Sequence, residues 1–221
     1  MYRFFVIISN ILFPKYLSLG YNKLTIIKAV LQITNYANYV KDIDCDCYSF
    51  KSSKGETVNV RTSLLITTDN ETNKTVTYVL KNPSKANEHE SDLTINKVIK
   101  AAYKQGASKI YIFNALPFYL TDSNQLISFV KKLKKNESRD YYNAVSKNLE
   151  VIKNYLATRS EDEFVCAWGS NTTDEENLNN IIREIIQYRS QVKRIKLIDN
   201  YPIHPQGKPI DMNNPFEPLN L

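Results

Sequence analysis

From residue 75 onward, short apolar runs alternate with longer segments in which apolar residues recur at helical spacing. The runs lie at residues 75–80, 109–113, 164–168 and 194–198. They are rich in β-branched and aromatic residues, which is typical of buried strands. Between the first two runs, Ile95, Val98 and Ile99 mark one face of a helix that begins near Ser91 or Asp92 and ends before Gly106. Thr173 and Glu176 form a capping box that predicts the start of a later helix.

Strands that alternate with helices predict parallel pairing with right-handed crossovers. Residues 48–68 alternate in places between apolar and polar positions and predict a hairpin at the sheet edge. We therefore expect one α/β domain over residues 46–221, a three-layer sandwich with a mainly parallel central sheet.

Residues 1–45 precede this pattern, and we interpret them as an N-terminal extension. The apolar stretch from Phe4 to Leu19 is interrupted by Asn10, Pro14 and Lys15. It falls short of the roughly 20 apolar residues that a membrane-spanning helix needs. A signal peptide is the alternative, because Arg3 precedes the apolar stretch, but no small-residue cleavage site follows. A packed N-terminal element or an upstream start codon is the preferred explanation.

Composition and charge exclude only a few classes of protein. The chain has 221 residues and a formal net charge of +6, with 43% hydrophobic and 24% charged residues. These values suit an ordinary globular protein and exclude collagen-like, coiled-coil and fully disordered classes. Moderate basicity permits nucleic-acid binding without requiring it. Three Cys are too few for a disulfide scaffold and predict free thiols in the cytoplasm.

Several chemistries are excluded by missing motifs. The sequence has no phosphate-binding P-loop, no dinucleotide-binding glycine fingerprint and no nucleophile elbow. Two His exclude a His-rich metal site, and His89 lies in a charged segment expected at the surface. Cys45 and Cys47 offer two thiols without a partner cluster, so we interpret them as incidental residues of a strand or turn. We expect neither a cofactor nor a metal.

Polar or tightly turning segments follow the four predicted strands. They are residues 82–84, Asn114, residues 169–171 and residues 204–205. Ligands of open parallel sheets bind beyond the carboxyl ends of the strands, where these four segments would meet. Turn residues are common at strand ends, so their convergence carries more weight than any one of them.

The same segments occur in the order in which the sequence motifs of a known family occur. Residues 79–87, Val-Leu-Lys-Asn-Pro-Ser-Lys-Ala-Asn, and then Asp92-Leu93-Thr94 resemble the signature of a bacterial and phage family, the domain of unknown function 1643. The pattern continues through Asn114, Thr121-Asp122, Ala167-Trp168-Gly169 and Pro202-Ile203-His204-Pro205. The resemblance covers about residues 48–210, and the family has no established activity.

A more remote resemblance is to the uracil-DNA glycosylase superfamily, which implies a glycosylase-like version of the predicted fold. It implies that Asn82 positions a water and that His204 stabilises the leaving base as the catalytic His. Asn114 would read the base through its amide. The remaining substrate-binding residues it implies are Pro83, Ser84, Trp168 and Gly169.

The resemblance predicts a hydrolase that cleaves the N-glycosidic bond of a nucleobase in DNA, with DNA or a nucleotide as partner and no membrane. The expected nucleic-acid contacts are Lys131, Lys132, Lys134, Lys135 and Lys208. Two departures are Asn82 where the superfamily can carry Asp, and residues 206–209 where it carries Ser-Pro and an apolar wedge. They leave open a modified base, a free nucleoside or nucleotide, or no reaction. The alternatives are a non-catalytic nucleic-acid or nucleotide-binding module and a phage- or defence-related interaction protein with a vestigial pocket.

Overall fold

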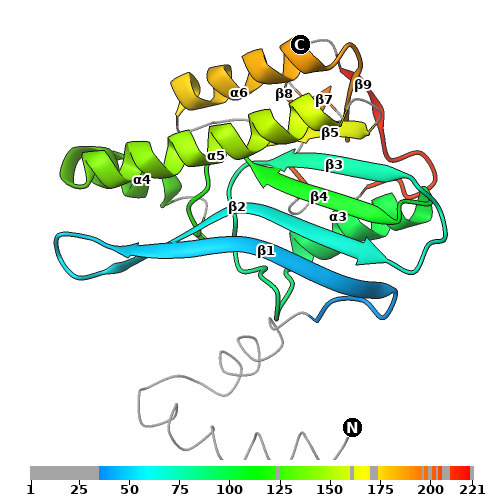
Figure 1. Cartoon of the computed structure of the whole chain (residues 1–221), viewed down its shortest axis with the longest axis horizontal. Coiled ribbons are helices and arrows are strands. Elements are labelled where there is room, and N and C mark those ends of the chain that lie inside the picture. The colour runs from blue at the N-terminus through cyan, green and yellow to red at the C-terminus, as the bar shows by residue number, and fades with distance from the viewer. Residues whose placement is uncertain are drawn as a thin grey trace, which may run out of the picture. The chain divides into compact units, whose positions relative to one another are not determined.

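In the computed structural model (Figure 1), the chain divides into two units, residues 1–35 and residues 36–221. It describes residues 35–122, 125–159, 162–169, 174–195, 197–198, 201–202, 204–205 and 210–219. The predictions for residues 1–34 therefore lie outside the described residues. None of the described helices is long and apolar enough to cross a membrane.

The second unit is an α/β structure built on a seven-stranded sheet with the order β1-β2-β4-β3-β5-β6-β9. These strands are β1 (Val40–Lys51), β2 (Thr57–Thr68), β3 (Thr75–Leu80), β4 (Lys109–Asn114), β5 (Glu163–Ala167), β6 (Val192–Arg194) and β9 (Glu217–Leu219). The helices are α3 (Leu93–Lys104), α4 (Leu126–Asn136), α5 (Ser138–Thr158) and α6 (Glu175–Tyr188). A separate two-stranded sheet pairs β7 (Leu197–Ile198) with β8 (Tyr201–Pro202).

The sheet is mixed, and the prediction of a mainly parallel sheet is wrong. Strands β4, β3, β5 and β6 pair in parallel. The remaining pairings, β1 with β2, β2 with β4, and β6 with β9, are antiparallel. The error has two physical causes. The hairpin adds two long strands to the sheet through β2, and the C-terminal segment pairs with β6 as the antiparallel strand β9.

The predicted edge hairpin is present and longer than the alternating pattern indicated. Strand β1 begins at Val40, which pairs with Thr68, and ends at Lys51, which pairs with Thr57. The predicted domain boundary between residues 45 and 46 consequently falls inside β1. The predicted strand at residues 194–198 is also displaced, because the sheet holds residues 192–194 and the chain then leaves it for β7.

Helices lie on both faces of the sheet, as Figure 1 shows. Side chains of β3 alternate between the faces, because successive residues of a strand point in opposite directions. Val76, Tyr78 and Leu80 belong to the apolar core that includes α3. Val79 belongs to the core that includes α5 and α6, and Thr77 Oγ1 lies 2.5 Å from the Tyr155 hydroxyl of α5.

Capping residues fix where two of the helices begin. Asp92 is the N-cap of α3, and its Oδ1 accepts a hydrogen bond of 2.8 Å from Ile95 N. Asp174 is the N-cap of α6, and its Oδ1 accepts from Asn177 N at 3.3 Å. The cap is thus the residue after Thr173, which itself lies outside the described residues.

Candidate functional site

Three of the four predicted polar segments meet at one edge of the sheet. Leu80 pairs with Asn114 on one side and with Ala167 on the other. The contact continues past the strands, because Leu116 N donates to Lys81 O at 2.8 Å. The segments that follow β3, β4 and β5 therefore leave the sheet side by side, as the sequence predicted.

Gly169 brings the fourth segment to this edge. Its φ is +76°, a left-handed conformation that favours glycine. A Cβ added at Gly169 would lie 2.9 Å from the Cβ of His204. Glycine is therefore required both for the turn and for the close approach of His204. The other predicted turn residues, Ser170 and Asn171, lie outside the described residues.

His204 is held in its neutral form at this edge. Burial is the main cause that lowers its pKa to about 4, and the nearby charge of Lys81 acts in the same direction. Asp92 opposes them and raises the pKa by a smaller amount. At pH 7 the imidazole is uncharged, so one ring nitrogen carries a proton and can donate a hydrogen bond.

Asn114 is buried with its amide orientation fixed. Arg61 Nη2 donates to Asn114 Oδ1 at 2.8 Å, and Asn114 is 1% exposed. A guanidinium can only donate, so the oxygen of the amide must face Arg61. Asn114 Nδ2 is buried and has no hydrogen-bond partner among the described residues. A buried donor without a partner is costly, which makes it a candidate contact for a ligand acceptor.

Arg61 is the residue of this site that the sequence analysis missed. It is 1% exposed, and its Nη1 donates to Ala86 O at 2.7 Å. In the described part of the chain, no carboxylate forms an ion pair with it. Burial lowers the pKa of Arg61, but a guanidinium stays protonated in proteins. One feature of the sequence could have pointed to Arg61: it is a charged residue within a predicted strand, residues 58–66, that is otherwise apolar or uncharged.

Tyr119 completes the enclosure of Arg61. Its ring centroid lies 5.7 Å from the guanidinium carbon of Arg61, a cation–π contact. Its hydroxyl donates to Ala86 O at 3.0 Å. Both Arg61 and Tyr119 therefore hold the same carbonyl of the loop after β3. This loop, residues 81–92, carries the Asn-Pro-Ser segment and is fixed to the sheet by them.

Asn82 connects the same loop to the segment after β4 through hydrogen bonds of its side-chain amide. Its Nδ2 donates to Pro83 O and to Leu120 O, each at 2.9 Å, and reaches Phe118 O at 3.5 Å. These contacts join the loop after β3 to the segment after β4, and they leave Oδ1 as the atom that can accept from a water. Pro83 is buried, and Ser84 beside it is partly buried.

Trp168 lies away from Asn114. It is 2% exposed and belongs to the core formed with α5 and α6. Asn114 extends from β4 on the face of Ile110 and Ile112, which belong to the core with α3. The structure therefore gives Trp168 a packing role and keeps it out of the group around Asn114.

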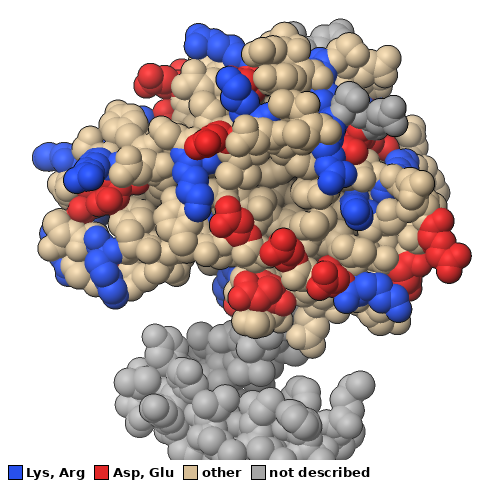
Figure 2. All heavy atoms as spheres, in the orientation of Figure 1, with Lys and Arg blue, Asp and Glu red and all other residues tan. Residues whose placement is uncertain are grey.

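Two of the lysines predicted to contact nucleic acid are paired with carboxylates. Lys132 pairs with Glu56 at 2.9 Å, and Lys134 pairs with the buried Asp174 at 3.0 Å. Lys131 and Lys135 are exposed on α4, and Lys208 lies outside the described residues. Figure 2 shows basic and acidic side chains interspersed over much of the visible face.

The fold and this edge define an α/β protein with a mixed sheet, whose strand ends gather a neutral histidine, a buried asparagine and a buried arginine. The chain belongs to the family described as "Protein of unknown function (DUF1643)", whose model matches residues 63–206. The matched range includes Asn82, Asn114 and His204, whereas Arg61 precedes it. No curated protein matches the chain significantly.

Proposed function

We propose that the chain is a glycosylase-like hydrolase that binds a nucleobase of DNA at this sheet edge and cleaves its N-glycosidic bond. The observation that carries the proposal is Asn114, whose Oδ1 is held by Arg61 while its buried Nδ2 lacks a partner among the described residues. A buried amide donor of fixed orientation can discriminate between nucleobases. A base that presents no acceptor to this donor leaves a buried polar group without a hydrogen bond.

His204 supplies the electrostatic part of the proposed reaction. Cleavage passes through an oxocarbenium-like sugar, and the base departs with the bonding electron pair. A neutral imidazole keeps one N–H, which can stabilise the developing base anion by donating a hydrogen bond to it. The lowered pKa of His204, about 4, keeps it in that form across neutral pH.

Asn82 holds the water in this mechanism. Its Nδ2 is engaged by backbone carbonyls, so Oδ1 accepts a hydrogen bond from the attacking water. The water adds its oxygen to the sugar carbon and releases a proton to solvent. An amide is not a base, so its contribution is positioning alone.

The orientation of Asn114 sets the expected base preference. Nδ2 needs an acceptor, which uracil and thymine present as a carbonyl where cytosine has an amine. We expect cleavage of uracil-type bases, including 5-hydroxymethyluracil, and none of cytosine-type bases. The test is alkali-induced strand scission of single- and double-stranded oligonucleotides that carry one such base. Scission of cytosine-type and uracil-type substrates at equal rates would contradict the assigned role of Asn114.

A second candidate function is non-catalytic binding of a nucleotide. It is favoured by the two cationic side chains at this edge, the buried Arg61 and the partly buried Lys81, which attract an anionic ligand. Titration of uridine and deoxyuridine monophosphate, followed by calorimetry and by chromatography for released base, separates the two functions. Binding that is lost in Asn114→Leu, with no released base, would favour the binding module.

A further inference from the structure

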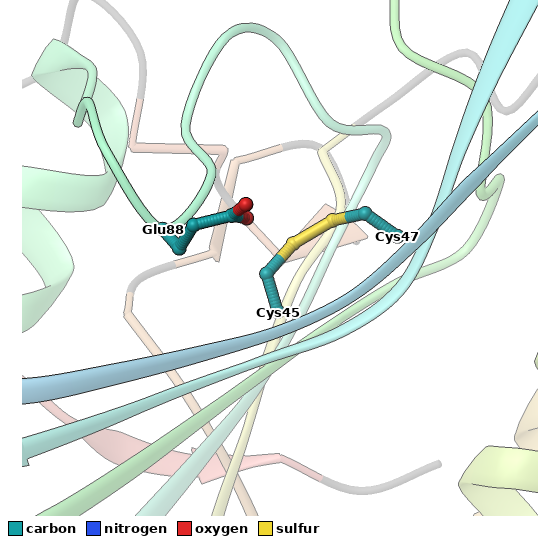
Figure 3. A group of neighbouring side chains, drawn as sticks. All are labelled: Cys45, Cys47 and Glu88. Atoms are coloured by element: carbon teal, nitrogen blue, oxygen red, sulfur yellow. A yellow bond between two sulfur atoms is a disulfide. The ribbon is translucent and has the colours of Figure 1, made fainter.

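Two cysteines and a glutamate meet outside the proposed nucleobase site (Figure 3). Cys45 and Cys47 lie on β1, and Glu88 extends toward them from the loop of residues 81–92. The two Sγ atoms and a carboxylate oxygen of Glu88 all lie within 4.8 Å of one another. Cys45 is partly buried, whereas Cys47 and Glu88 are exposed, so solvent ions can reach the group.

The two sulfurs are joined as a disulfide in the structure, which differs from the free thiols predicted from the sequence. Cys166 is free and buried in β5. A dithiol or phosphine reductant passes two electrons to the disulfide and is itself oxidised to its disulfide or phosphine oxide. The sulfurs take up two protons, which leaves two thiols on one edge strand. In that state the group offers two thiol sulfurs and one carboxylate.

We propose that the reduced form of Cys45 and Cys47, together with Glu88, binds one thiophilic divalent cation of the Zn²⁺ type. Two thiols lose their protons to solvent, and each thiolate donates an electron pair to the metal. Zn–S bonds of about 2.3 Å and Zn–O bonds of about 2.1 Å place tetrahedral ligand atoms about 3.5–3.8 Å apart. The bonded sulfurs must therefore move apart on reduction to reach this spacing, while a carboxylate oxygen of Glu88 already lies within 4.8 Å of both. Water would take the fourth position.

The charge around the group suits a cation. Figure 2 shows several acidic side chains along the edge where β1 runs. Asp46, between the two cysteines in sequence, pairs instead with Lys147 of α5 at 3.8 Å. Glu88 Oε1 lies 3.4 Å from Nε2 of His89, whose side chain is 84% exposed. A metal can displace this weak surface contact, because exposed pairs contribute little energy.

Metal binding would join β1 to the loop of residues 81–92. Tyr119 lies between this group and the buried arginine: its hydroxyl is 3.5 Å from Cys47 Sγ and donates to Ala86 O at 3.0 Å. Arg61 donates to the same carbonyl. The cation would therefore hold the loop of residues 81–92 from the solvent side, whereas Arg61 and Tyr119 hold it from the protein interior.

The test is Co²⁺ titration of the full chain after reduction with a phosphine, followed by competition with Zn²⁺. Thiolate-bound Co²⁺ has an intense sulfur-to-metal charge-transfer band in the near ultraviolet. We expect one Co²⁺ per chain, displaced by one Zn²⁺. Cys45→Ser and Cys47→Ser should each weaken binding at least 100-fold and reduce the band, and Glu88→Gln should weaken it at least tenfold. Asp44→Asn, a neighbouring acidic residue outside the group, is the matched control and should bind like the wild type.

The oxidised chain provides an internal control, because the disulfide has no thiolate to offer. It should bind Co²⁺ no better than the Cys45→Ser, Cys47→Ser double variant, and circular dichroism establishes that each variant is folded. Reduced wild type that binds Co²⁺ no more tightly than that double variant would overturn the proposal. Wild-type affinity in Glu88→Gln would overturn the assignment of Glu88 as a ligand.

Discussion

Arg61 Nη2 donates a hydrogen bond of 2.8 Å to Asn114 Oδ1, and both side chains are buried where β2 meets the carboxyl end of β4. This contact sets which atom of the Asn114 amide faces a ligand. It also places a permanent positive charge inside the protein without a carboxylate partner among the described residues. Such a charge is expensive to bury, so its presence requires a reason beyond stability.

Substitutions of Arg61 and Asn114 should show that their effects on the free energy of unfolding and on nucleobase binding are separable. Arg61→Met leaves Asn114 Oδ1 and Ala86 O without their donor, so we expect a loss of about 2–4 kcal/mol of unfolding free energy. The Arg61→Met, Asn114→Leu double variant removes both polar partners and should recover part of that loss. It should nevertheless bind no nucleobase ligand. Urea denaturation of the two single variants and the double variant measures the coupling, and strictly additive losses would contradict the described contact.

Gly169→Ala should disturb His204 as well as the backbone. Alanine at φ +76° costs about 1 kcal/mol, and its Cβ would lie 2.9 Å from His204 Cβ. Gly55→Ala is the matched control, because Gly55 has φ +77° and an added Cβ meets nothing within 4 Å. We expect Gly169→Ala to lower the thermal midpoint more than Gly55→Ala and to shift the His204 ring resonances. Equal midpoints and unchanged resonances would argue against the close approach.

Asn82→Asp should destabilise the loop more than Asn82→Ala. The Asn82 amide donates to Pro83 O and Leu120 O, and a carboxylate would face both carbonyls with like partial charge. We expect a loss of about 2–3 kcal/mol for Asp at pH 7 and about 1–2 kcal/mol for Ala. Below pH 4 the Asp carboxyl is protonated and the difference should shrink. Chemical denaturation at pH 7 and pH 3.5 checks this, and a more stable Asp variant at pH 7 would contradict it.

The pKa of His204 predicts a pH dependence of stability. Its folded pKa is about 4, below the ordinary 6.5, so between these values the unfolded chain binds more protons than the folded chain. Stability contributed by the neutral form is complete above about pH 6.5 and falls as the pH is lowered to about 4. Relative to His204→Gln, the wild type should lose about 2–3 kcal/mol between pH 7.5 and 4.5. A constant difference between the two proteins across this window would contradict the burial of a neutral His204.

The pattern of apolar residues along the chain made the central part of the fold predictable. Strands β3, β4 and β5 are buried runs between helices with apolar faces, so the meeting of Asn82, Asn114 and Gly169 at one edge followed from their positions at the strand ends. The long-range pairing of β2 with β4 and the return of β9 could not be predicted, because antiparallel neighbours distant in sequence leave no local signal. The charge of Arg61 within an apolar strand was visible in the sequence, but its contact with Asn114 was not, since only the β2–β4 pairing brings the two residues together.

The most direct test of the proposed function compares wild type with His204→Ala in single-turnover cleavage of an oligonucleotide that carries one uracil-type base. Strand scission after alkali reports the abasic site that glycosidic cleavage leaves. The proposed function predicts scission by the wild type, a loss of at least 100-fold in rate in His204→Ala, and retained binding of the oligonucleotide by that variant. Absence of scission by the wild type on every uracil-type substrate, single- or double-stranded, would contradict the assignment of this edge as a glycosylase site.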